Sequence, residues 1–150
     1  MKPARLFARP CLAGWLCATL LAAAGLARAH QPGAAAGEET ITPLQNEMLR
    51  DLPGKQAAMV VVAYAPGQAS APHRHGGTVM AYVLEGSVVS QVGDQPATTY
   101  RAGQSWVETP LAPHRVSRNA SRTRPARLLV WLLMDQGGAV KEPLPPSPPG

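Results

Sequence analysis

Short runs of β-branched and apolar residues, separated by turn residues, restrict the fold of this sequence more than any other feature. The runs recur at intervals of roughly 8–12 residues, the spacing of strands in all-β sandwiches and barrels. Only Leu44–Leu52 is compatible with a short helix. We therefore predict an all-β fold, a single small β-barrel. The predicted strands are Ala57–Tyr64, Val79–Leu84, Ser87–Val92, Thr98–Arg101, Ser105–Glu108, His114–Ser117 and Ala126–Met134.

The first 29 residues have the order of a secretory signal peptide. Met1–Arg9 is basic without an acidic residue, an apolar run covers Cys11–Leu26, and Ala27-Arg28-Ala29 supplies the small residues of a cleavage site. A single transmembrane anchor is the alternative, but the run is shorter than the roughly 20 apolar residues that a spanning helix needs. We expect residues 1–29 to be removed, leaving a chain that starts at His30 in the periplasm or outside the cell.

Removal of residues 1–29 changes the net charge of the chain, and net charge affects which partners it can bind. The chain has 14 Lys and Arg against 9 Asp and Glu, and four of the basic residues but no acidic residue precede position 30. The mature charge is therefore 10 − 9 = +1, and the basic pI gives no reason to expect a nucleic-acid partner. Both cysteines are lost as well, which excludes a disulfide in the mature chain. After cleavage we expect no membrane contact.

The two ends of the mature chain have the composition of segments outside a barrel. Residues 30–39 are rich in Ala, Gly and Pro, which predicts a flexible leader. Residues 137–150 include five prolines in the last eight positions, and we expect a disordered tail that joins no sheet. The barrel is therefore assigned to residues 40–136.

Three of the four histidines are placed as metal ligands would be. His73 and His75 flank one residue, and positions i and i+2 of an extended segment point to the same face. His114 begins a later predicted strand. Imidazole suits Fe, Mn, Zn or Ni, so the ligands predict a divalent metal ion without naming it. The alternative is that His-x-His is an accident of a surface loop.

The histidines belong to a longer pattern that resembles the two motifs of the cupin superfamily, in particular its small single-domain members. The resemblance covers residues 40–134 and implies a jelly-roll-like barrel with a metal ion on the histidines. The residues that carry it are Gly67, His73, His75 and Gly86 for the first motif and Gly103, Pro110, His114 and Asn119 for the second.

Two departures from the family pattern bear on chemistry. Val79 stands where the family has a glutamate ligand, and Pro110-Leu111-Ala112-Pro113 replaces a turn that usually contains glycine. The resemblance then implies a site of three histidines with an open position. Such a site is similar to those of cupin-type thiol dioxygenases and diketone-cleaving dioxygenases.

Glu108 is the candidate catalytic residue. It ends a predicted strand before His114, and an inward side chain would serve as a general base or as a ligand in place of the missing carboxylate. The alternative is a charge on the barrel rim. An arginine cluster after His114 either receives an anionic substrate or is a solvated turn; its members are Arg115, Arg118, Arg122, Arg124 and Arg127.

These features predict an exported metal-binding cupin that is a small-molecule metalloenzyme, dioxygenase-like or isomerase-like, using the three histidines. The alternative is a non-catalytic envelope module that binds a small ligand or the metal itself, so the sequence leaves catalysis open. The expected partners are a small-molecule ligand or substrate and a second copy of the chain, because an open β-edge favours pairing.

Overall fold

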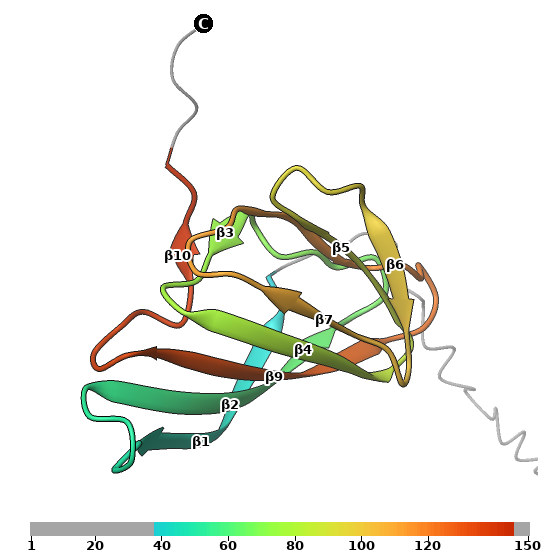
Figure 1. The fold of residues 1–150 in the computed structure, drawn as a ribbon. Helices are drawn as coiled ribbons and strands as arrows, with labels where there is room; N and C mark the ends of the chain where they lie inside the picture. Colours follow the sequence, from blue (N-terminus) through green and yellow to red (C-terminus); the bar gives the residue numbers. More distant parts are fainter. Residues whose placement is uncertain (1–37, 146–150) are drawn as a thin grey trace, which may run out of the picture. The chain divides into compact units, whose positions relative to one another are not determined.

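The computed structural model describes residues 38–145, which form two antiparallel five-stranded sheets and no helix (Figure 1). The first sheet has the order β1-β2-β9-β4-β7 and the second β10-β3-β8-β5-β6. The all-β prediction is confirmed, and each predicted strand is present with both ends within two residues of the expected positions. The strands are β1 Thr40–Met48, β2 Lys55–Tyr64, β3 His73–Arg74, β4 Thr78–Glu85, β5 Ser87–Val92, β6 Thr98–Arg101, β7 Ser105–Glu108, β8 His114–Asn119, β9 Ala126–Asp135 and β10 Glu142–Pro143.

The core follows from the alternation of residues along the central strands. Every second residue of β9, and of β2 from Ala58 onward, is buried, because successive side chains of a strand point to opposite faces. The two strands pair without interruption from Lys55↔Asp135 to Tyr64↔Ala126, so their buried residues form one continuous apolar layer. This layer is the apolar wall of the cavity described below. Its central members are Val60, Val62, Leu128, Val130 and Leu132.

Two glycines permit close approaches that another residue would block. Gly86, between β4 and β5, has φ +72°, and a Cβ there would lie 2.5 Å from the carbonyl oxygen of Pro125. Gly77 precedes β4, and a Cβ there would lie 2.1 Å from the carbonyl oxygen of Leu133 on β9. Because Gly77 comes two residues after His75, it sets the distance between the histidine segment and the first sheet.

Leu44–Leu52, the segment that is compatible with a short helix by sequence, forms no helix. Residues 40–48 form β1, which pairs with β2 from Thr40↔Ala63 to Met48↔Gln56 with an irregularity between Pro43 and Gln45. All residues of β1 are exposed, so its strand state comes from hydrogen bonds to β2 rather than from a buried apolar face.

The prediction that the tail joins no sheet is also wrong for its first part. Glu142 and Pro143 form β10, which pairs with Arg74 and His73. Proline is tolerated there because β10 is the edge strand of its sheet. One edge of its backbone has no neighbouring strand, so the missing N–H of proline costs no hydrogen bond on that side. The predicted signal peptide and most of the predicted leader lie outside the described residues. Within residues 38–145 there is no helix long and apolar enough to cross a membrane.

Candidate metal centre

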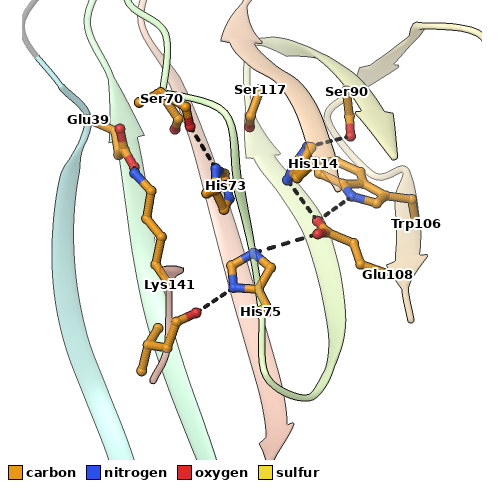
Figure 2. A network of polar contacts seen from close by, with 12 residues as sticks. Glu39, Ser70, His73, His75, Ser90, Trp106, Glu108, His114, Ser117 and Lys141 are labelled. Carbon is orange, nitrogen blue, oxygen red and sulfur yellow. Dashed lines mark hydrogen bonds and ion pairs between the residues drawn. The ribbon is translucent and has the colours of Figure 1, made fainter. Parts of the chain in front are cut away.

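The second sheet brings the three predicted ligands together inside the barrel. His73 lies on β3, His75 follows that strand directly, and His114 begins β8 as the antiparallel partner of His73. The ring centroid of His73 lies 4.8 Å from that of His75 and 4.9 Å from that of His114. One nitrogen from each ring lies within 4.8 Å of the other two, and all three residues are buried (Figure 2). The three imidazoles are therefore grouped closely enough to share one ion.

Backbone carbonyls determine which ring nitrogens of His73 and His75 face the centre. Nδ1 of His73 donates to the carbonyl oxygen of Ala71 at 2.8 Å, and Nδ1 of His75 donates to that of Val140. A carbonyl oxygen only accepts, so each neutral ring carries its hydrogen on Nδ1 and a lone pair on Nε2. This arrangement, a ligand histidine held by a carbonyl through its other nitrogen, is typical of protein metal sites.

His114 is held by a hydroxyl group instead. Its Nε2 forms a hydrogen bond of 2.9 Å with Oγ of Ser90 on the adjacent strand β5. Its Nδ1 is buried and makes no hydrogen bond to any described residue, although Oε1 of Glu108 lies 3.2 Å away. The nitrogen that faces the centre is thus Nδ1.

The pKa of His73 is lowered from 6.5 to about 4. Burial is the main cause, because the charged ring loses its hydration, and the nearby His114, His75 and Lys141 lower the pKa further. The hydrogen bond to Ala71 raises the pKa of His73, but by less than burial lowers it. At neutral pH His73 is therefore the neutral imidazole that metal binding requires.

Glu108 faces the histidines, so the alternative of a charge on the barrel rim does not hold. The residue is 2% exposed and lies on β7 directly opposite Val79 of β4. Its Oε1 accepts a hydrogen bond of 3.0 Å from Nε1 of Trp106. The neighbouring strand thus supplies a carboxylate across the ladder from the position where the family motif has one.

The second oxygen of Glu108 has an acceptor as its neighbour. Oε2 lies 3.5 Å from Nε2 of His75 and makes no hydrogen bond within the described part of the chain. Burial raises the pKa of Glu108, but contacts with His114, His75 and Trp106 lower it by more, so the carboxyl group is charged at neutral pH. When the His75 ring is neutral, a charged oxygen beside its Nε2 lone pair is unfavourable in a buried site, and a cation next to both atoms removes the repulsion. The imidazole nitrogens of the three histidines and the free oxygen of Glu108 therefore fit a metal ion.

Leu111 occupies the turn that replaces the glycine-containing turn of the family. It is the non-glycine residue with positive φ in the described structure, at 62°, a conformation that costs an L-residue roughly 1–2 kcal/mol. Its backbone N–H donates to the carbonyl oxygen of His75 at 2.8 Å. The turn therefore keeps its shape without glycine and holds the histidine segment in place.

The centre lines a cavity of about 50 Å³. On another side of it, the hydroxyl of Tyr64 forms hydrogen bonds of 2.7 Å with Ser70 and 2.8 Å with Ser117. Glu39 and Lys141 also line it, and they form an ion pair. None of these five residues was predicted from the sequence. Alternation along residues 57–64 is a signal for an inward Tyr64, whereas Glu39 and Lys141 fall outside the predicted barrel bounds and no local signal identifies them.

The arginine cluster after His114 is not part of the cavity wall. All five arginines are exposed, and Arg115 pairs with the exposed Asp94 at 3.3 Å. None of them is among the residues that line the cavity in the described structure. This placement agrees with a solvated turn rather than with a receptor for an anionic substrate.

Comparisons with known proteins give a family and a fold. The model of the cupin domain family matches residues 60–132. Protein TT1209 from Thermus thermophilus is 30% identical, with a TM-score of 0.51 over 63% of this chain and 82% of that one. A conserved protein with a double-stranded β-helix domain from Klebsiella pneumoniae is 20% identical, with a TM-score of 0.56 over 75% of this chain and 84% of that one.

An enzyme is also among the similar solved structures. Oxalate oxidase in complex with the substrate analogue glycolate is 22% identical, with a TM-score of 0.51 over 63% of this chain and 50% of that one. The chain thus spans about half the length of this enzyme, and the likeness concerns the fold. No curated protein matches the chain.

Proposed function

We propose that this chain, which belongs to the cupin superfamily, binds a divalent transition-metal ion on His73, His75 and His114 and acts with it on a small molecule. One observation carries the proposal: one nitrogen from each of the three buried histidines lies within 4.8 Å of the other two, and the unsatisfied Oε2 of Glu108 lies 3.5 Å from Nε2 of His75. A cation beside both atoms removes their repulsion. Imidazole nitrogens with a carboxylate oxygen are ligands that Fe, Mn, Zn and Ni accept.

In this proposal Glu108 is the fourth ligand rather than the general base. Trp106 fixes one of its oxygens and leaves the other directed at His75. The carboxylate that the family motif has at position 79 is thus replaced from β7, and Val79 fills the vacated place as part of the apolar wall. The loss of the family glutamate is thereby compensated.

The reaction takes place in the cavity beside the histidines. A bound divalent ion would supply Lewis acidity, polarising an oxygen atom of the substrate. The apolar residues of β2 and β9 exclude water on one side, while Tyr64, Ser70 and Ser117 offer hydroxyl groups for orienting a polar ligand. A cavity beside a metal ion suits an enzyme of dioxygenase-like or isomerase-like class, whereas the likeness to oxalate oxidase concerns the fold alone. We further propose that the protein works in the periplasm or outside the cell, because residues 1–29 have signal-peptide order.

Metal analysis of the protein purified without chelator tests the metal site. We expect about one equivalent of iron, manganese, zinc or nickel, which is sharply reduced in His73→Ala, His75→Ala and His114→Ala. His30→Ala is the matched control and should keep its metal. At metal concentrations about 100-fold above Kd, chelation should remove about 2.7 kcal/mol of stability. Full metal occupancy in His114→Ala would refute the assignment.

An exchange of residues across the β4–β7 ladder tests the role of Glu108. We expect Glu108→Val to weaken metal binding, and the double variant Glu108→Val/Val79→Glu to regain it, because the two positions are direct cross-strand partners. Val79→Glu alone places two carboxylates side by side in a buried site. Competition with a fluorescent chelator measures each affinity. Unchanged metal affinity in Glu108→Val would show that Glu108 is not a ligand.

A further inference from the structure

A buried ion pair closes one side of the metal cavity. Nζ of Lys141 donates to Oε1 of Glu39 at 2.5 Å, and the two side chains are 24% and 4% exposed. Both residues line the cavity that the three histidines line. In Figure 2 the Lys141 side chain runs along the side of His73 and His75 away from Glu108, with Glu39 at its ammonium end. The ion pair therefore lines the space in which a small molecule beside the three histidines would bind.

The Glu39 carboxylate lies in the cavity only partly satisfied. Its Oε1 accepts a hydrogen bond from Nζ of Lys141, whereas the buried Oε2 has no hydrogen-bond partner among residues 38–145. Burial raises the pKa of Glu39, but the hydrogen bond and the positive charge of Lys141 help to lower it below its ordinary value, so the group is charged at neutral pH. A buried charge with an unsatisfied oxygen gives little stability, because desolvation offsets the attraction of its partner. The Glu39 carboxylate thus resembles a weakly bound ligand of Lys141 more than the partner of a stabilising ion pair.

Lys141 keeps its place without Glu39. The next residue, Glu142, pairs in the sheet with Arg74 and accepts a hydrogen bond of 3.1 Å from its Nε. The preceding residue, Val140, holds Nδ1 of His75 through its carbonyl oxygen. The backbone on both sides of Lys141 is thus tied to the histidine segment, so its side chain still starts beside the cavity when Glu39 moves away.

We propose that Lys141 is the receptor for the carboxylate group of a small anionic ligand, and that Glu39 occupies this receptor when the ligand is absent. Lys141 is the one Lys or Arg among the cavity-lining residues of the described structure. A cavity of about 50 Å³ has room for a few groups of water size, which matches a carboxylate as small as acetate. When the carboxylate of the ligand replaces that of Glu39 beside Lys141, the net charge of the cavity is unchanged. This inference goes beyond the proposed function, because Lys141 can bind the anion with or without a metal ion.

Acetate and its neutral analogue acetamide are suitable probes. Each is titrated by calorimetry at pH 7 into the full protein, with and without metal, for the wild type, Glu39→Gln, Lys141→Met and the double variant. If the internal pair is closed about nine-tenths of the time, its removal raises the apparent affinity about tenfold. We therefore expect Glu39→Gln to bind acetate about tenfold more tightly, and Lys141→Met and the double variant to bind it more weakly than Glu39→Gln by at least that factor. Acetamide binding should not change.

Glu38→Gln is the matched control, because it removes the same charge from the adjacent exposed residue. Unchanged acetate affinity in Glu39→Gln, or a gain that persists in the double variant, would overturn the proposal. A gain of equal size in Glu38→Gln would also overturn it. Metal content is measured on the same samples, so that a loss of metal counts against the metal site and a missing acetate effect counts against Lys141 alone.

Discussion

Acid should destabilise the metal-free protein chiefly through His73. The pKa of this residue is about 4 in the folded protein against an ordinary value of 6.5. Because the unfolded chain binds the proton more tightly, the stability associated with neutral His73 is complete above pH 6.5 and is lost as the pH falls through 4. A difference of about 2.5 pKa units at ~1.4 kcal/mol each corresponds to about 3 kcal/mol. This is a large part of the stability of an ordinary small domain.

Glu108 contributes in the same direction but in a different pH range. Its pKa is lowered from an ordinary value of 4.5, so its contribution is present above that value and disappears as the pH falls below it. Between pH 6.5 and about 4.5 the loss should therefore come mostly from His73 rather than from Glu108.

Urea unfolding of the chelator-treated protein between pH 7 and pH 4, followed by tryptophan fluorescence, measures the effect. The wild type should lose about 3 kcal/mol over this range. His73→Gln cannot take up the proton, so its unfolding free energy should change much less with pH, whatever its value at pH 7. An equal loss in the wild type and in His73→Gln would refute the assignment of the pH dependence to this residue.

Three other predictions concern the turn, the edge strand and the N-terminus. Leu111→Gly should stabilise the protein by about 0.5–1 kcal/mol in urea unfolding, because relief of the positive φ exceeds the added entropy of glycine in the unfolded chain; a loss of stability would contradict the strain. β1 is an exposed edge strand, and we expect it to pair two chains, so sedimentation should show a dimer in the wild type and a monomer in Leu44→Lys. A monomer for the wild type at micromolar concentrations would contradict this pairing. Mass spectrometry of the exported protein should give a chain that starts at His30, and retention of residues 1–29 would contradict export with cleavage.

Local patterns in the sequence were sufficient for much of the fold and for the core of the site. Runs of β-branched and apolar residues between turn residues are local features, so they predicted β2, β4 and β9, and the period of two of an extended segment predicted the common direction of His73 and His75. The spacing of the motifs also selected His114, which the structure places opposite His73. Strands without such a run were missed. β1 is exposed along its whole length, and the two residues of β10 have no period that a sequence could display.

Only the tertiary structure decided which distant residues meet at the cavity. The direction of Glu108 and its place opposite Val79 depend on the register between β4 and β7, which neither strand encodes by itself. The carbonyl oxygen of Val140 reaches His75 across 65 positions of the chain, and Lys141 reaches Glu39 across 102. Such contacts are absent from local patterns, because the closing of the barrel brings these segments together and the same side chains in other registers would face solvent.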